Sequence, residues 1–271
     1  MVARRSPSDS AEVSNVEALR EALAEREAEV EELRSKIAKS ASAGEEFLAE
    51  AAHAIRSPLT VTHSYLEILN SDLCEGLTEE QKSFLGIAFE NATKLRHLID
   101  DLVDLAALET GTAQIELAPI LINESLTSMQ SEYQTIAERK GLKLTTDISE
   151  DLPTVNIDHD RLKDVLRRLL DNAFRFTPEG GSVSLRAIHD QERVTIEVVD
   201  NGIGIPADRI NDAFHEFVQL HRKPGQNREG YGLGLPLCRR TVEIFGGTLE
   251  LAGVEGEGTT VTIQIPASHH E

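Results

Sequence analysis

The N-terminal part of the chain carries apolar residues at heptad spacing. The seam positions are Val16, Leu19, Leu23, Arg26, Val30, Leu33 and Ile37, and the flanking positions are dense in Glu and Arg. Because only Arg26 breaks the seam, the pattern predicts a short dimeric coiled coil over residues 15–43, after a disordered tail over 1–14. A solitary solvated helix stays open as the alternative, since three heptads with one charged seam position are few.

Two longer amphipathic stretches follow, over residues 45–73 and 81–111. Thr78 and Gln81 have the spacing of a capping box before the second helix, and Gly111 is a suitable C-terminal stop. The seam of that helix alternates by four and three through Phe84, Ala88, Asn91, Leu95, Leu98, Leu102 and Leu105. Two such helices with a short loop predict an antiparallel hairpin. One hairpin buries its seam poorly, so two copies are expected to pair into a dimeric four-helix bundle.

After Gly111 the pattern changes to short runs with strand character, separated by helical stretches. The strand-like runs are IELAPI, LKLTTDI, SVSLRAI, RVTIEVVD, TLELAGV and TTVTIQI, and the helical stretches cover 123–140, 159–174 and 234–246. This order predicts an α+β domain with helices on one face of a sheet, beginning near residues 111–118. The expected fold class is therefore multidomain α and α+β: coiled coil, helical hairpin, then a layered domain over 112–271.

The amino-acid composition bears on which kinds of partner the protein can bind. The 271 residues carry a formal net charge of −20, with 40% hydrophobic and only 4% aromatic residues. A charge this negative argues against general binding to nucleic acid or to an anionic membrane, because both need a basic surface. A local basic pocket for a phosphorylated ligand stays compatible with it.

The cysteines and the chain start bear on localisation. Cys74 and Cys238 are far apart and have no metal-ligand spacing, so a reducing cytosol is the default expectation. The opening MVARRSPSDS has no apolar stretch of a signal peptide, and no apolar run approaches the ~20 residues of a spanning helix. We expect a cytoplasmic protein without membrane insertion.

Two glycine clusters are candidate ligand loops. DNGIGIP follows the strand VTIEVV, where Gly202 and Gly204 permit a tight backbone and Asp200 could accept a hydrogen bond from an exocyclic amine. Alone, this spacing is a weak signal, since most such stretches are turns. GYGLGLP, over 230–236, opens a helix whose N–H groups favour phosphate, yet it has neither the P-loop nor the Rossmann spacing.

A third stretch, LLDNAFRFTP, places polar residues on a helix. Asn172 could supply an oxygen to Mg²⁺, Arg175 could face phosphates, and Phe176 could stack on a flat base. Each residue alone also has a plain structural interpretation: Asn172 exposed, Arg175 with its stem along the surface, and Phe176 in the core. Together, in this order and spacing, they are specific.

These stretches resemble a sensor histidine kinase over residues 44–267. HAIRSPL is similar to the H box of that family, LLDNAFRFTP to its N box, DNGIGIP to its G1 box, AFHEFVQL to its F box and GYGLGLPL to its G2 box. The resemblance implies a dimerisation and phosphotransfer domain over 44–111, followed by a Bergerat-type ATP-binding domain, a mixed sheet covered by helices.

The resemblance also implies ligand roles. Asp200 would contact the adenine amine, and Asn172 would hold Mg²⁺. The G2 residues around the phosphates would be Gly230, Gly232, Leu233, Gly234 and Leu235. A lid over 218–230 would carry Arg222, Lys223 and Arg228, with Phe214 and Phe217 at its base.

By the same resemblance His53 is the phosphoacceptor. Its imidazole would attack the γ-phosphorus of ATP and then pass the phosphoryl group to an aspartate of a response-regulator receiver. Arg56 and Ser57 lie in the same box, and Pro58 is expected to bend the helix as a hinge because it lacks an N–H. Without the motif, a surface histidine would be the plainer interpretation.

Two positions depart from the family pattern. Ala54 stands where the family usually has Glu or Asp, and loss of a positioned base typically costs about 10²–10⁴-fold in rate. With Ser57 three residues on, this predicts weak receiver phosphatase activity. Arg168 stands where the family usually has Asn, and is expected either to add a cation near phosphate or Mg²⁺ or to turn into solvent.

Three functions remain to be compared. The first is an active histidine kinase that forms a homodimer, binds a receiver and takes its signal through the coiled coil or a separate sensor protein. The second is a pseudokinase that holds a receiver, favoured by Ala54 and Arg168 and opposed by the intact His53 and Asp200. A serine kinase or ATPase is the third, and the hairpin carrying His53 argues against it.

Overall fold

The computed structural model describes five segments of the chain, all within one unit that spans residues 51–271: 55–56, 59–69, 77–190, 192–220 and 231–268. The predicted tail and coiled coil over 1–43 lie outside the described residues, as do His53, Ala54, Ser57, Pro58 and Gly230.

The hairpin begins with helical residues 59–69 and continues in α2, Glu79–Thr110. The predicted capping box is confirmed: the Thr78 N–H donates to Gln81 Oε1 (2.9 Å), and the Gln81 N–H donates to Thr78 Oγ1 (3.3 Å). Gly111 ends the helix at φ 69°, a left-handed conformation that glycine adopts without strain. His63 Nε2 lies 3.0 Å from Thr93 Oγ1, so the two helical segments are in contact.

The predicted seam of α2 is buried only toward its C-terminal end. Phe84 is 63% exposed and Leu95 is 42% exposed, whereas Leu105 is 4% exposed. Within the single chain, Ala92 and Ile99 are the buried apolar residues in the middle of the helix. The N-terminal half of the seam is thus an apolar face that the described part of the chain leaves exposed.

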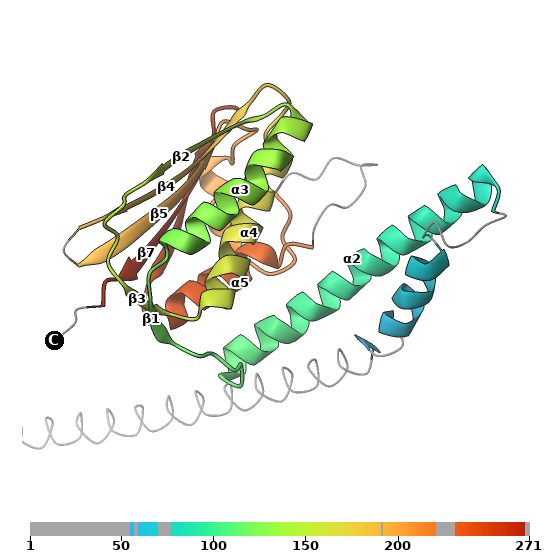
Figure 1. The fold of residues 1–271 in the computed structure, drawn as a ribbon, viewed down its shortest axis with the longest axis horizontal. Coiled ribbons are helices and arrows are strands. Elements are labelled where there is room, and N and C mark those ends of the chain that lie inside the picture. The colour runs from blue at the N-terminus through green and yellow to red at the C-terminus, as the bar shows by residue number, and fades with distance from the viewer. Residues whose placement is uncertain (1–54, 57–58, 70–76, 191, 221–230, 269–271) are drawn as a thin grey trace, which may run out of the picture. The chain divides into compact units, whose positions relative to one another are not determined.

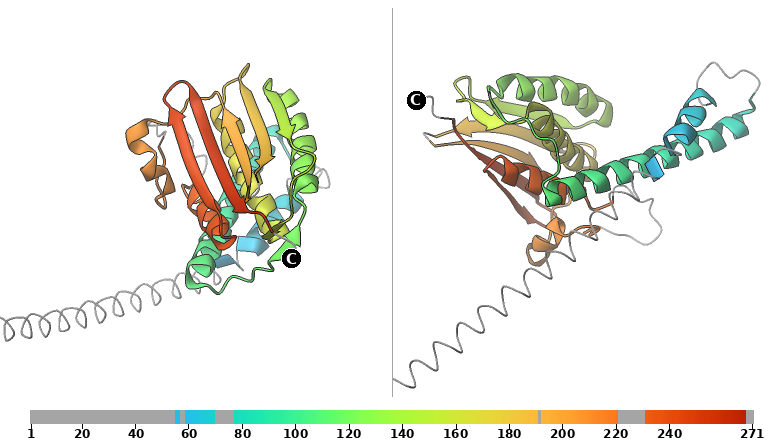
Figure 2. Two further views of the ribbon diagram at one scale, coloured as in Figure 1. Left: turned by 90° about the vertical axis from the view of Figure 1, so that its left-hand side faces the viewer. Right: turned by 90° about the horizontal axis from the view of Figure 1, so that it is seen from below.

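The layered domain has a five-stranded sheet in the order β2-β4-β5-β7-β6. These strands are β2 Lys143–Ile148, β4 Ser182–His189, β5 Arg193–Asp200, β6 Thr248–Val254 and β7 Gly258–Pro266. β2 is parallel to β4 and every other pair is antiparallel, so the predicted mixed sheet is confirmed. Figure 2 shows the strands side by side.

Three helices cover one face of this sheet, as the sequence predicts (Figure 1). They are α3 Asn123–Lys140, α4 His159–Phe176 and α5 Gly234–Ile244. The first matches its predicted range, α4 runs two residues further and α5 ends two residues earlier. The chain turns after α5 at Gly246, whose φ of 73° suits glycine.

A two-stranded sheet differs from the prediction. Of IELAPI only β1, Ala118–Ile120, is a strand, and it pairs antiparallel with β3, Val155–Ile157. β3 escaped prediction because three residues are too few for an alternating pattern. Two 3-10 turns, η1 Ala207–Arg209 and η2 Asn211–Phe214, follow the first glycine loop.

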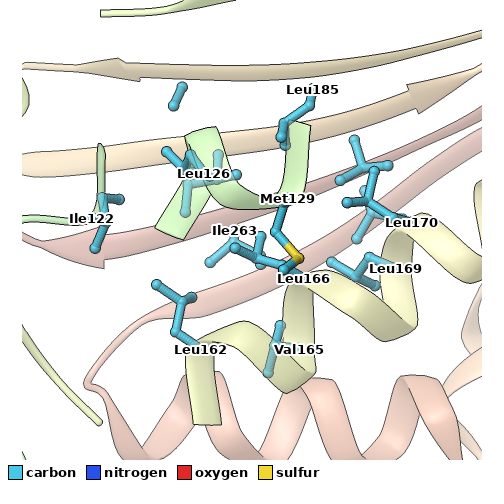
Figure 3. Packing of buried hydrophobic residues seen from close by; sticks show 14 of the residues in the cluster. Ile122, Leu126, Met129, Leu162, Val165, Leu166, Leu169, Leu170, Leu185 and Ile263 are labelled. Carbon is cyan, nitrogen blue, oxygen red and sulfur yellow. The ribbon is translucent and has the colours of Figure 1, made fainter. Parts of the chain in front are cut away.

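The core lies between the helices and the sheet, and α4 supplies much of it. Its buried positions recur at helical spacing: Leu162, Val165, Leu166, Leu169, Leu170, Ala173 and Phe174. Figure 3 shows several of them packed against Met129 of α3 and against Leu185 and Ile263 of the sheet. Alternate residues of β5 are buried, as expected for a strand with one face on the core. This packing fixes the face that α4 turns away from the core.

Among the described residues, no helix is both long and apolar enough to cross a membrane.

Candidate functional site

Asp200 ends β5 and opens the first glycine loop. Its Oδ1 accepts a hydrogen bond from the Gly202 N–H at 2.9 Å. Burial raises the pKa of Asp200, and hydrogen bonds from the Gly202 and Thr259 N–H groups offset only part of that rise. A half-buried carboxylate with a raised pKa gains from a further hydrogen-bond donor, and an exocyclic amine is such a donor.

The loop itself needs its glycines. A Cβ at Gly202 would lie 2.4 Å from the Phe176 carbonyl oxygen, and one at Gly204, at φ 65°, would lie 1.8 Å from that of Val254. The Ile203 N–H donates to the Phe176 carbonyl at 3.2 Å, so the loop is tied to the C-terminus of α4. The G1 and N boxes, predicted as separate candidates, are therefore in contact.

The polar residues of α4 lie at that same end. Arg175 donates a hydrogen bond to Asn172 Oδ1, and its guanidinium lies over the Phe176 ring, 4.8 Å from the ring centroid. Phe176 is 36% exposed, so its interpretation as a core residue is wrong. A cation at Asn172 Oδ1 requires Arg175 to turn away from that oxygen. Arg175 and Asn172 thus act as one unit rather than as independent ligands.

The second glycine loop leads into α5. Gly232 has φ 76°, and its carbonyl accepts the Phe217 N–H at 3.2 Å, which joins the F and G2 boxes. Gly234 begins the helix, so the free N–H groups of the first turn lie here. Phe214 packs against the main core, whereas Phe217 is 57% exposed.

The side chains of the two leucines of this loop contact apolar residues. Leu233 is 1% exposed and packs with Leu105 and Leu108 of α2, and Leu235 is partly buried against the main core. Both are predicted as nucleotide-binding residues. Because Leu233 is buried, its contact with a nucleotide would come from its backbone.

Arg168 also differs from expectation. Its Nη2 donates to Asp101 Oδ1 of α2 at 2.8 Å, so its side chain is paired with α2 rather than turned into solvent. Arg56 of the H box likewise pairs with Asp100 at 2.7 Å. The lid residues Arg222, Lys223 and Arg228 lie outside the described residues.

Two residues of the site were missed in the sequence. Gly258, at φ 114°, lets β7 approach Asp200, because a Cβ there would lie 1.9 Å from the Asp200 carbonyl oxygen. Asp158 caps α4 by accepting the Asp160 and Arg161 N–H groups. An Asp directly before a predicted helix was a usable signal for the cap. Nothing in the spacing GEG, by contrast, distinguishes Gly258 from an ordinary turn residue.

The donor set limits how a metal can bind. The described residues contain no group of three or more His, Cys, Asp or Glu side chains arranged for a metal ion. A hard cation at Asn172 would therefore depend on that one amide oxygen, water and the phosphate oxygens of a nucleotide. This is how Mg²⁺ commonly binds beside phosphates, so the residues present fit it.

Two family models match the chain. The model described as Histidine kinase-, DNA gyrase B-, and HSP90-like ATPase matches residues 157–269, and the His Kinase A (phospho-acceptor) domain matches residues 43–111. The adaptive-response sensory kinase SasA of Rippkaea orientalis (strain PCC 8801 / RF-1) is 33% identical over 230 residues, covering 81% of this chain and 57% of that protein. The non-motile and phage-resistance protein of Caulobacter vibrioides (strain ATCC 19089 / CIP 103742 / CB 15) is 30% identical over 266 residues, covering 96% and 31%.

A solved structure agrees with this likeness. The crystal structure of full-length ShkA in complex with AMPPNP is similar with a TM-score of 0.69 at 30% identity, covering 83% of this chain and 47% of that chain. This chain thus spans less than two thirds of the length of these relatives. Both matched domains, in the same order as the predicted boxes, lead to one conclusion: the chain belongs to the sensor histidine kinase family.

Proposed function

We propose that this protein is an ATP-dependent histidine kinase that phosphorylates its own His53 and passes the phosphoryl group to an aspartate of a response-regulator receiver. One observation carries the proposal. Asp200, its glycine loop and the Asn172 end of α4 meet in one place, in a chain whose H box precedes them.

The nucleotide would be held by groups from the first glycine loop, the C-terminal end of α4 and the second glycine loop. The Asp200 carboxylate accepts from the adenine amine, and the exposed Phe176 ring lies beside the base. The N–H groups around Gly232 and Gly234 face the phosphates. Mg²⁺, when bound at Asn172, neutralises phosphate charge and so favours transfer.

The transfer step balances as an in-line displacement. A ring nitrogen of His53 forms the new N–P bond, the bond from the γ-phosphorus to the β,γ-bridging oxygen breaks, and ADP leaves with that electron pair. The imidazole must be neutral to attack, and it loses its proton to solvent afterwards. Transfer to the receiver then breaks the N–P bond and forms an O–P bond on an aspartate.

Ala54 shapes the rate of these steps. Its methyl group cannot accept a proton from the ring or orient a water molecule, so we propose slow autophosphorylation and weak phosphatase activity toward the receiver. A loss of about 10²–10⁴-fold is typical when a positioned base is absent. Rapid dephosphorylation of a receiver by this protein contradicts the phosphatase part.

Labelling with γ-³²P ATP and Mg²⁺ tests the main proposal. The expected result is an acid-labile, alkali-stable label on the wild type and none on His53→Ala. A label that survives this substitution refutes the assignment of His53. The variant Asp200→Asn should lose the label and bind nucleotide more weakly, whereas His53→Ala should keep its affinity.

The same experiment decides a second candidate. A pseudokinase that regulates a receiver by binding is favoured by Ala54, and by the hydrogen bond through which Arg175 occupies Asn172 Oδ1. Its signature is nucleotide binding that Asp200→Asn weakens, together with no label on the wild type at any Mg²⁺ concentration.

The proposed setting is a cytoplasmic homodimer that receives its signal through the N-terminal segment or a separate sensor protein. The exposed apolar face of α2 supports the dimer, and the net charge of −20 supports a protein partner rather than nucleic acid or membrane.

A further inference from the structure

One turn of α2 forms three ion pairs with two other parts of the chain, the H box and α4. We call Asp100, Asp101 and Asp104 the acidic turn. Asp100 pairs with Arg56 of the H box at 2.7 Å. Asp101 pairs with Arg168 at 2.8 Å and Asp104 pairs with Arg161 at 2.5 Å. Arg161 and Arg168 are seven residues apart on α4, and therefore lie on one face of that helix.

An apolar contact continues from the acidic turn along α2. Leu105 and Leu108 of α2 pack against Leu233 and Leu237 at the start of α5, and all four are at most 4% exposed. The two ion pairs between α2 and α4 lie next to this apolar contact, since Asp104 directly precedes Leu105. Their side chains are only 20–30% exposed. Partly buried pairs of this kind are screened less by salt than surface pairs are.

The guanidinium of Arg168 is stabilised in its charged form by the ion pair with Asp101. Burial by itself lowers the pKa of its guanidinium, but the hydrogen bond and the charge of Asp101 outweigh burial and leave the pKa above its ordinary value. The neighbouring Arg167 is different, because its ion pair lies within α4, with Asp164 at 3.0 Å. The two adjacent arginines therefore provide a matched test pair.

The acidic turn thus contacts both the H box and the nucleotide-binding helix α4. Asp100 anchors the H box through Arg56, three residues after His53, and the adjacent Asp101 anchors α4 one helical turn before Asn172. We propose that Arg168 and Arg161 are positioning residues that dock the nucleotide-binding helix on the turn of α2 that also anchors the H box. This inference rests on the proposed autophosphorylation of His53. Misplacement of reacting groups by about 1 Å can cost about 10²-fold in rate, so docking of this kind acts on the transfer step and not on affinity.

Charge reversal in the full-length chain tests the role. Arg168→Asp should slow autophosphorylation by about tenfold or more while its ATP affinity, measured by calorimetry, stays within about twofold. The double variant Arg168→Asp with Asp101→Arg should recover most of the rate. Arg167→Asp should leave the rate unchanged. Arg161→Asp with and without Asp104→Arg repeats the cycle should Arg168→Asp fold poorly.

A readout that needs no catalysis accompanies the rates. Hydrogen exchange of α2 residues 98–110, without nucleotide, should speed up in Arg168→Asp and return toward wild type in the double variant. If the wild type carries no label on His53, the proposed function fails, and exchange still decides whether the docking exists. Faster autophosphorylation of Arg168→Asp, a loss of ATP affinity with unchanged exchange, or a lost rate that Asp101→Arg does not restore each overturns the positioning role.

Discussion

The layered domain and α2 use the same amphipathic pattern with different results. In α4 the apolar positions that face the sheet are buried, and Leu162 and Leu166 are 0% exposed. In α2 the apolar residues Phe84 and Ile87 are 63% and 55% exposed, whereas Leu105, which packs with the start of α5, is 4% exposed. Among the described residues, the layered domain thus closes its core within one chain, whereas α2 has an exposed apolar stretch in its N-terminal half.

This difference separates two kinds of stability. A core closed within one chain gives a free energy of unfolding that does not depend on protein concentration. An apolar face left open gains its burial from a second molecule, so its stability follows mass action. Periodicity identifies the apolar face of a helix in both cases but does not identify what covers it.

The largest expected effect comes from the closed core. Leu166→Ala should lower the free energy of unfolding of the layered domain by about 2–5 kcal/mol, because it leaves a cavity among residues that cannot all relax. Urea unfolding followed through the buried Tyr133 measures this. Ile188→Ala is the control, since Ile188 is 42% exposed at the end of β4, and it should cost about 0.5 kcal/mol or less. A cost below 1 kcal/mol for Leu166→Ala contradicts a fully packed core.

The open face should respond through association instead. Leu95→Ala should weaken the proposed dimer by about 2 kcal/mol, or roughly thirtyfold in dissociation constant, because two partly exposed leucines per dimer lose their burial. Analytical ultracentrifugation over a dilution series measures this. Leu117→Ala is matched in exposure, 44% against 42%, but lies outside the hairpin and should leave the constant unchanged. An equal effect of both variants would remove the distinction between the two regions.

A smaller effect is expected at the start of α2. Thr78→Ala removes the side-chain half of the capping box and should destabilise the helix by about 1 kcal/mol. Hydrogen exchange over residues 79–83 should accelerate about fivefold, and Thr78→Ser should retain the wild-type rate. Unchanged exchange in Thr78→Ala would mean that dimer packing, and not the cap, holds this end of α2.

The fold was largely predictable where a pattern had enough length to repeat. The ranges of α3 and of β4 and β5 follow from periods of 3.6 and 2 over six or more residues. β3 did not, because three residues carry no period and its partner β1 is equally short. The cap at Thr78 and the stop at Gly111 were predictable because both act within one helical turn.

The sequence indicated which residues form the site better than it indicated their contacts. Asp200 and Gly202 follow from the resemblance, and their mutual hydrogen bond is local. The packing of Leu233 and the ion pair of Arg168 were not predictable, because both involve α2, more than 60 residues away in sequence. No spacing within the N box shows that Asp101 is the partner of Arg168, since that contact depends on how the hairpin and the layered domain pack.

The smallest expected effect is the pH dependence of nucleotide affinity. Burial raises the pKa of Asp200 in the free protein, and a donor such as the adenine amine favours the charged carboxylate, which lowers the pKa again in the complex. ATP binding therefore releases protons from Asp200, and affinity should fall as pH falls toward that raised pKa. From pH 8 to pH 5.5, above the sequence pI of about 4.8, we therefore expect nucleotide affinity to decrease, because the raised pKa of Asp200 brings its protonation closer to this range. Calorimetry in two buffers of different ionisation enthalpy measures the protons released.

The control is Asp208→Asn, which removes an exposed carboxylate on η1 and keeps Asp200. The phosphate groups of ATP titrate equally when ATP binds to this control and when it binds, more weakly, to Asp200→Asn. The difference between the pH profiles of the two variants therefore isolates the contribution of Asp200. An affinity attributable to Asp200 that rises as pH falls would mean that its carboxyl group binds the nucleotide in the protonated form, and that the amine is not its partner.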